Sequence, residues 1–306
     1  MFELWVPITL TAAFLQCLRT ALQKRLNARL STNATTFARY LYGFPLAFVY
    51  VGLLLAVAGL ELPALNATFA LYCLVGGVAQ ILATSLLIHL FALRNFAVGT
   101  IYSKTEVVQT ALFGVVILAE SVSFGGLLAI VVSMVGVILL SLVGQPAASQ
   151  TAGGARSRAW DYRAAVIGLL SGGCFAIASV SVRAAALSLE GDGIILSAGL
   201  VLACMNFLQT LLLGFYLGWR ERVQLLAVVA DWRAPALVGI TSVLGSGCWF
   251  TALALQNAAY VRILGQTELV FTFLASHLLF RERSRPSEIA GVVLIVVGVV
   301  LLLWLR

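Results

Sequence analysis

The sequence has few charged residues for its length. Only 10% of its 306 residues are Asp, Glu, Lys or Arg, whereas 61% are apolar. A soluble domain carries charge at roughly a quarter of its positions, so this composition excludes a protein whose surface faces mainly water. We therefore expect lipid to be the main solvent around the chain.

The sequence also lacks the usual patterns of catalytic and metal sites. Its two histidines, His89 and His277, have no metal-ligand spacing and belong to no H-E-x-x-H motif, and no phosphate-binding or dinucleotide-binding loop is present. Five cysteines, an odd number, all lie in apolar runs and are expected to be buried hydrophobic residues. We therefore expect no catalytic residue, no metal, no cofactor and no nucleic-acid partner, although a membrane-embedded enzyme stays an alternative.

Long apolar runs fill most of the chain. A helix needs about 20 mostly apolar residues to cross about 30 Å of hydrocarbon. The runs are continuous rather than alternating, which excludes a β-barrel. We predict an all-α integral membrane protein with ten transmembrane helices, at residues 5–23, 37–59, 67–90, 98–119, 124–142, 162–187, 195–218, 234–253, 260–280 and 287–305.

The two halves of the chain are related in sequence. Residues 74–142 align with residues 236–304 without a gap. Two unrelated apolar helices would match by chance at Leu and Val, whereas here rare polar residues match as well, so the repeat is real. The matched polar residues are Asn95 and Asn257, Thr105-Glu106 and Thr267-Glu268, Thr110 and Thr272, and Glu120 and Glu282.

Each half holds five predicted spans, so the second half enters the membrane in the opposite sense to the first. We predict two inverted five-helix repeats, over residues 1–145 and 146–306. Secondary transporters use such repeats to place a site at the interface of two related halves.

The fourth and fifth predicted helices of the two halves end on matching motifs. The fourth ends at Glu120 or Glu282, and the fifth closes on Gly136-Val-Ile-Leu-Leu or Gly298-Val-Val-Leu-Leu. In these features the whole chain resembles the EamA-type branch of the drug/metabolite transporter superfamily. A proline often found in the middle of the fourth helix of that family is absent here.

The resemblance implies a secondary transporter of the bacterial inner membrane, working by alternating access as a monomer or a homodimer. Acids and a lysine inside the spans favour a small amphipathic substrate, such as an amino acid. Protons are one candidate for the driving force, and a substrate gradient is the other. A non-transporting membrane subunit or receptor is the main alternative function.

Glu106 and Glu268 lie near the middle of the fourth and ninth predicted helices. A carboxylate facing lipid at that depth costs at least about 3 kcal/mol, so both must face protein or water. Since the inverted repeat relates the two helices, we expect the acids to lie close together beside a central pathway. Two adjacent carboxylates are not both ionised cheaply, so one is expected to hold a proton near neutral pH. A purely structural hydrogen-bonded pair is the alternative.

Lys104 lies two residues before Glu106, so it points to a different side of the helix and needs another partner or water. Gln266 replaces it in the second half. Arg262 lies nearer a helix end, where it either joins the site or extends to the lipid headgroups.

Further polar and aromatic residues are expected to line the same pathway. Inter-helix hydrogen bonding or core packing explains each of them taken singly. These candidates are Arg39, Gln80, Tyr102, Ser103, Thr110, Asn206, Trp249 and Thr272, with Gln16 on the first helix.

Basic residues lie mostly in the loops on one side of the predicted membrane. The positive-inside rule places these loops in the cytoplasm and both termini outside. The family resemblance implies the opposite orientation, because its members generally have cytoplasmic termini. The residues concerned are Lys24, Arg25, Arg29, Arg94, Arg156, Arg158, Arg220, Arg222, Arg233, Arg281, Arg283 and Arg285.

Overall fold

The computed structural model describes residues 3–92, 102–143, 155–190, 193–280 and 286–305, and all regular elements in these ranges are α-helices. This confirms the all-helical prediction. Asn95, Glu282 and the basic residues at 94, 281, 283 and 285 lie outside the described residues, as do the side chains of Arg156, Arg158 and His277.

Several described helices are long and apolar enough to cross a membrane. Seven segments qualify by length and composition, and Phe124–Leu140 is a shorter apolar helix. The chain is thus a multi-pass membrane protein, while the total of ten spans and their inverted order stay predictions. The seven segments are Trp5–Gln23, Thr32–Val57, Ala67–Leu87, Arg163–Leu187, Ile194–Arg220, Arg233–Leu255 and Pro286–Leu305.

The helices form two compact units. Unit 1 comprises Met1–Ile81 and Ala178–Asn257, and unit 2 comprises Leu82–Ile177 and Ala258–Arg306. Each unit therefore takes helices from both halves of the sequence, and its boundaries differ from those of the predicted repeats.

Unit 1 contains α1 to α3 and α9 to α11, with parts of α4 and α8. These helices are α1 (Trp5–Leu26), α2 (Thr32–Leu41), α3 (Phe44–Ala58), α4 (Ala67–Ala92), α8 (Ala155–Leu187), α9 (Ile194–Arg220), α10 (Arg222–Ala230) and α11 (Arg233–Leu255).

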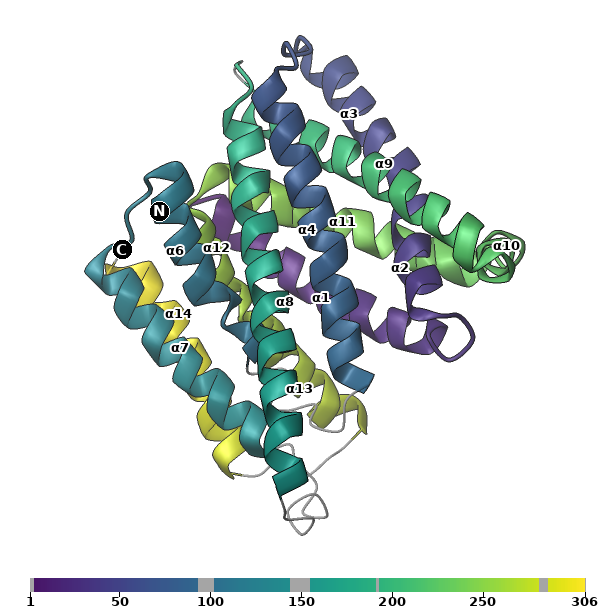
Figure 1. Cartoon of the computed structure of the whole chain (residues 1–306). Coiled ribbons are helices and arrows are strands. Elements are labelled where there is room, and N and C mark those ends of the chain that lie inside the picture. The colour runs from purple at the N-terminus through teal and green to yellow at the C-terminus, as the bar shows by residue number, and fades with distance from the viewer. Residues whose placement is uncertain (1–2, 93–101, 144–154, 191–192, 281–285, 306) are drawn as a thin grey trace. The chain divides into compact units, whose positions relative to one another are not determined.

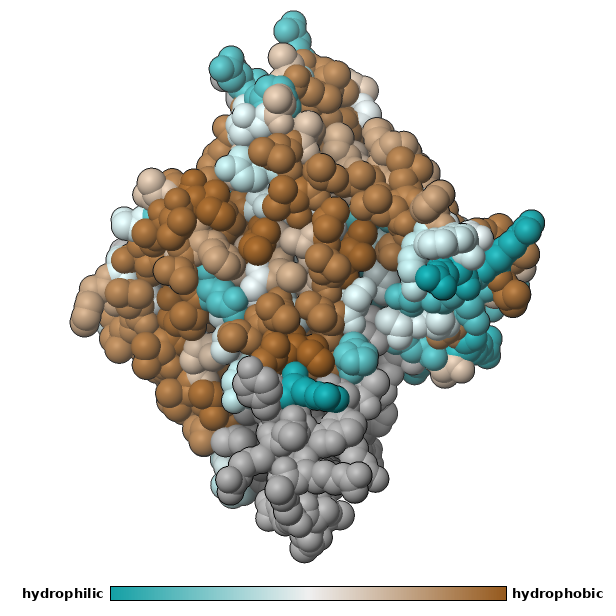
Figure 2. Space-filling model, in the orientation of Figure 1, coloured by the Kyte–Doolittle hydropathy of each residue, from teal (hydrophilic) through white to brown (hydrophobic). Residues whose placement is uncertain are grey.

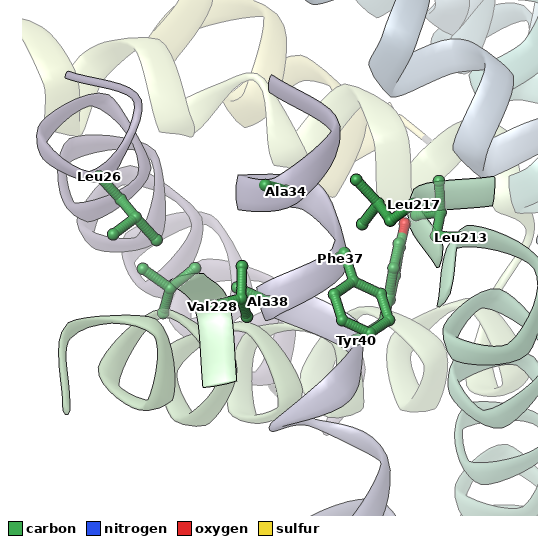
Figure 3. Packing of buried hydrophobic residues seen from close by; sticks show 9 residues of the cluster. Leu26, Ala34, Phe37, Ala38, Tyr40, Leu213, Leu217 and Val228 are labelled. Carbon is green, nitrogen blue, oxygen red and sulfur yellow. The ribbon is translucent and has the colours of Figure 1, made fainter. Parts of the chain in front are cut away.

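The core of unit 1 is built around α2. Its buried side chains, among them Phe37 and Tyr40, lie between Leu213 and Leu217 of α9 on one side and Val228 of α10 on the other (Figure 3). Because Leu213 and Leu217 are one turn apart, α9 presents a single apolar face to α2. The packing thereby fixes the positions of both helices.

The predicted span 37–59 is in fact two helices. The chain leaves α2 after Leu41 and begins α3 with Pro45 in its first turn. Proline donates no backbone hydrogen bond and its ring clashes with the carbonyl four residues earlier, which is why the first helix stops there. A methyl group on Gly43 would lie 2.7 Å from the carbonyl oxygen of Arg39 and 3.6 Å from Nδ2 of Asn206. Glycine therefore permits the close approach at this break.

A short helix, α10, follows a sharp corner at the end of α9 and was assigned to a loop from the sequence. The corner residue Glu221 accepts hydrogen bonds from Ser31 Oγ at 2.5 Å and from Asn33 Nδ2 at 2.8 Å. Ser31 also caps α2 by accepting from the backbone N–H of Ala34. The same end of unit 1 carries an exposed ion pair between Arg29 and Asp231. Hydrophilic residues gather over this region in Figure 2.

Unit 2 contains α6, α7 and α12 to α14, with the remaining parts of α4 and α8. The new helices are α6 (Glu106–Leu118), α7 (Phe124–Val143), α12 (Ala258–Gly265), α13 (Thr267–Phe280) and α14 (Pro286–Leu305).

Helices α7 and α14 lie side by side (Figure 1) and cross at small residues. A methyl group on Gly136 would lie 2.7 Å from the carbonyl oxygen of Gly291, and one on Gly298 would lie 3.1 Å from the carbonyl oxygen of Ala129. Two backbones approach this closely only where no side chain intervenes. The small-residue stripe thus packs within one chain.

Candidate functional site

The predicted site residues divide between the two units, and each group is described by itself. Unit 2 holds Tyr102, Ser103, Lys104, Glu106, Thr110, Gln266, Glu268 and Thr272, and unit 1 holds Arg39, Gln80, Asn206 and Trp249.

In unit 2 the predicted spans 98–119 and 260–280 are interrupted at Thr105 and at Gln266, which lie within one residue of each other in the alignment of the repeat. The hydroxyl of Thr105 donates to the carbonyl of Tyr102 at 2.5 Å, and that of Thr267 donates to the carbonyl of Leu264 at 2.8 Å. The backbone N–H of Gln266 bonds three residues back, to Ile263. Such a tight turn inside a helix often marks a hinge. The repeated Thr-Glu pair therefore specifies a local conformation as well as a charge.

The two acids lie in the first turn of the helices that follow these interruptions, and each has a basic partner. Arg262 Nη1 lies 3.5 Å from Glu106 Oε1, and Lys104 Nζ lies 3.5 Å from Glu268 Oε2. All four side chains are at least four-fifths buried. Each ion pair joins a residue of the first half of the chain to one of the second half. Arg262 thus belongs to the site in this structure instead of extending to the headgroups.

The four charges form one cluster. Lys104 interacts electrostatically with both carboxylates and with the Arg262 guanidinium. The formal charge of the cluster is zero, with a cation within 3.5 Å of each carboxylate. The expectation of a shared proton rested on two acids without cations beside them, and these ion pairs remove that reason.

Buried hydrogen-bonding atoms lie near the charges in sequence and remain without partners in the described part of the chain. They are Thr110 Oγ1 and Gln266 Oε1, in side chains that are 0% and 2% exposed. Gln266 sits at the interruption between α12 and α13, and its amide is the counterpart of the Lys104 ammonium. Unit 2 therefore offers two buried neutral acceptors within a few residues of its charges in the sequence.

Three other predicted residues of unit 2 take no part in the two ion pairs. Ser103 is buried, whereas Tyr102 and Thr272 are exposed. The Thr272 hydroxyl donates to the backbone carbonyl of Glu268 one turn earlier at 2.8 Å. That bond supports the first turn of α13.

Helix α8 approaches the first interruption through a glycine pair that the sequence analysis missed. A methyl group on Gly172 would lie 2.9 Å from the carbonyl oxygen of Ser103 and 3.2 Å from the backbone nitrogen of Glu106. Gln109 Nε2 donates to Thr105 Oγ1 at 2.9 Å and lies against Gly173. The consecutive glycines in an otherwise apolar helix were the available signal.

In unit 1 the main feature is Arg39, which is only 5% exposed. It lies in the last turn of α2, not at the start of a span as the sequence predicted. Its Nη2 donates to Ser246 Oγ at 3.3 Å, and its guanidinium carbon lies 5.0 Å from the Tyr40 ring centroid. Its Nε is buried without a hydrogen-bond partner, and no described carboxylate pairs with it.

The interactions that stabilise the charge of Arg39 are weak relative to the free-energy cost of burying that charge. A cation near a helix C-terminus gains about 0.3–1 kcal/mol from the helix dipole. Taking an ion out of water costs several kcal/mol even after relaxation. Arg39 is therefore the described cation with the strongest physical reason to meet an anionic group.

A second arginine of unit 1 is satisfied by the backbone. Arg183 Nη1 donates to the carbonyls of Leu253 at 2.8 Å and Gln256 at 2.7 Å, at the C-terminal end of α11. Such carbonyls have no partner within their own helix. Arg183 thus has a structural role as a helix cap.

Two of the neutral candidates of unit 1, Gln80 and Trp249, form hydrogen bonds between helices. Gln209 Nε2 donates to Gln80 Oε1 at 2.8 Å, which links α4 to α9. Trp249 Nε1 donates to Gln16 Oε1 at 2.9 Å, which links α11 to α1. Within the described residues Asn206 has no such side-chain bond, and it lies against Gly43 at the break between α2 and α3. Of these residues Asn206 is therefore the best placed to accept a ligand.

Comparison with known proteins finds a family model that matches the second half of the chain. Residues 162–304 match the model of the EamA-like transporter family. The chain carries an EamA-like transporter domain. This confirms the resemblance to EamA-type members of the drug/metabolite transporter superfamily.

A solved structure is similar in fold to the chain over nearly its whole length. One crystal structure, described only as that of a protein, is similar with a TM-score of 0.72. It is 15% identical in sequence and covers 99% of this chain and 97% of its own. At this identity the likeness shows the fold alone. No curated protein matches the sequence.

Proposed function

We propose that the chain is a secondary transporter that moves a small zwitterionic metabolite, such as an amino acid, across the bacterial inner membrane by alternating access. The observation that carries this proposal is the pair of buried ion pairs at the two matching helix interruptions of unit 2. Interrupted helices are the elements on which many transporters build substrate and ion sites.

The chemistry of the cluster suits a ligand with one charge of each sign. The ammonium group of an amino acid competes with Lys104 for Glu268, and its carboxylate competes with Glu106 for Arg262. In a buried ion pair the attraction and the desolvation cost nearly cancel, so a ligand replaces either partner at a small net cost. Binding then releases protein charges that can form different contacts in another conformation.

A proton is the second candidate for the driving force. Protonation of Glu106 or Glu268 would break the same ion pairs that the ligand breaks. A proton and the substrate would then compete for the same carboxylate, and the transport rate would depend on pH. Substitution of the coupling acid by glutamine removes this dependence, because glutamine does not titrate.

The test is uptake of radiolabelled amino acids, supplied singly, into proteoliposomes over a series of pH values. We expect Glu106→Gln or Glu268→Gln to lower uptake at least tenfold or to flatten its pH profile, with normal protein abundance in the membrane. Wild-type rates and pH profiles in both single variants and in the double variant would refute the role of the acids. No flux above empty liposomes for any substrate would favour a non-transporting subunit or receptor.

A further inference from the structure

We infer that the corner between α9 and α10 is a binding site for an anionic phospholipid, with an acyl chain in an apolar groove and the phosphate on Arg220. This site is independent of the proposed transport function. It lies wholly within unit 1, at the end of α9.

An open groove of about 480 Å³ lies on the outer face of α9, lined by Phe215, Gly218 and Trp219. The opposite face of the same turns carries Leu213 and Leu217, which are buried against α2. The groove exists because Gly218 has no side chain between the two large aromatic rings. Only Leu225 of α10, at 3.9 Å, would meet a methyl group on Gly218. Its shape and apolar lining suit a hydrocarbon chain.

The charge at the head of the groove is positive. The Arg220 guanidinium carbon lies 4.7 Å from the ring centroid of Trp219, which lines the groove. The neighbouring acid, Glu221, is occupied by Ser31 and Asn33. Neither Arg220 nor Arg222 has an ion-pair partner in the described part of the chain. The site therefore presents exposed cations directly beside an apolar surface.

The corner also has the features of a membrane interface. Helix α9 is long enough to span, whereas α10 has only nine residues and exposes Val223 and Leu226. The Arg233 guanidinium carbon, at the start of α11, lies 6.0 Å from the ring centroid of Trp232. Tryptophan and arginine at helix ends lie at headgroup depth. Figure 1 shows α10 beside the end of α9, and Figure 2 shows hydrophilic atoms next to apolar ones there.

A phospholipid with a negative headgroup satisfies both parts of the site. Its phosphate pairs with the guanidinium of Arg220, which is well suited to phosphate oxygens, and its chain fills the groove. The predicted cytoplasmic position of this end agrees with the negative surface potential of the cytoplasmic leaflet. A zwitterionic lipid also fills the groove, but it lacks the net charge that the arginines favour.

The experiment measures binding of phosphatidylglycerol and of phosphatidylcholine to the purified protein in neutral detergent, by native mass spectrometry and by thermal stabilisation. We expect wild-type protein to prefer phosphatidylglycerol. Arg220→Gln should weaken that binding about fivefold, as removal of one cation near an anionic surface predicts. Gly218→Val should weaken binding of both lipids by filling the groove, and it should fold normally because the space is open. Arg233→Gln is the matched control, since Arg233 stacks on a tryptophan outside the groove.

Equal binding of the two lipids to the wild type would overturn the inference. So would phosphatidylglycerol binding that is unchanged in Arg220→Gln, or weakened as strongly in the control variant. Unchanged lipid binding in Gly218→Val would show that only the headgroup binds and that the groove holds no acyl chain. This result would also overturn the inference.

Discussion

The ion pair between Lys104 and Glu268 yields the sharpest energetic prediction. We consider Lys104→Gln, Glu268→Gln and the double variant. Lys104→Gln gives the first half the residue that the second half has naturally at Gln266. Each single variant leaves one buried charge without its partner, whereas the double variant removes both charges.

The structure sets the expected magnitudes. Two unit charges at the observed 3.5 Å attract by about 5 kcal/mol at an effective dielectric constant of 20. Removing one partner of a buried pair costs about 3–5 kcal/mol. Because the two side chains are 17% and 16% exposed, we expect the lower end, about 3 kcal/mol, for each single variant. The double variant should lose only about 1–2 kcal/mol, since replacing both ions by neutral groups is far less costly.

The assay is a double-mutant cycle on the free energy of unfolding, measured by denaturant titration in detergent. The equivalent cycle on Arg262 and Glu106 is the matched control and should give coupling of the same sign. A double variant whose loss equals the combined losses of the single variants would show that the pair is not coupled, and would refute the reasoning.

Four further outcomes are expected. In transport assays Lys104→Gln should lower the rate more than Gln266→Ala does, and equal mild losses would make Lys104 a packing residue. Arg39→Gln should lower the transport rate at least tenfold, with partial recovery in Arg39→Lys; unchanged rates in both variants would make Arg39 a structural residue of unit 1. Gly298→Val should destabilise the chain by at least about 2 kcal/mol by separating α7 from α14, and a normal unfolding midpoint would contradict that packing. A reporter fusion within residues 144–154, between α7 and α8 in the sequence, should be cytoplasmic, and an active alkaline phosphatase fusion there would reverse the predicted orientation.

Much of the fold could be predicted because lipid imposes simple rules on sequence. Continuous apolar runs predicted helices, and α4, α7 and α14 lie within a few residues of the expected spans. The short helix α10 was not predicted, because its nine residues are too few to cross a membrane, although they are enough to form a helix along a surface.

The helix interruptions could not be predicted from hydropathy, because the polar residues there, Ser103 to Glu106 and Gln266 to Glu268, indicate a polar site and not a break in the helix. Thr105 and Thr267 matched in the repeat, but a matching threonine does not indicate whether its hydroxyl bonds the backbone. The break at Gly43 had a clearer signal in the nearby Pro45, which ends α2 at Leu41.

The acids of the site could be predicted from the free-energy cost of placing a carboxylate in the membrane, but their ion-pair partners could not. Glu106 and Glu268 could be predicted as site residues because a carboxylate that faces lipid in an apolar helix has a high free-energy cost. Pairing across distant segments depends on which helix faces which, and one sequence does not contain that information. Lys104 therefore had no assigned partner, and Arg262 was left between the site and the headgroups until the structure placed each beside an acid.

The most direct test of the central claim is exchange in liposomes that contain only this protein. Proteoliposomes loaded with an unlabelled amino acid are diluted into the same labelled compound at low concentration, and labelled uptake is followed over time. The account predicts a transient accumulation of label above equilibrium, as a carrier with alternating access produces. Label that never exceeds equilibrium, or that enters no faster than into empty liposomes for any compound tested, would contradict it.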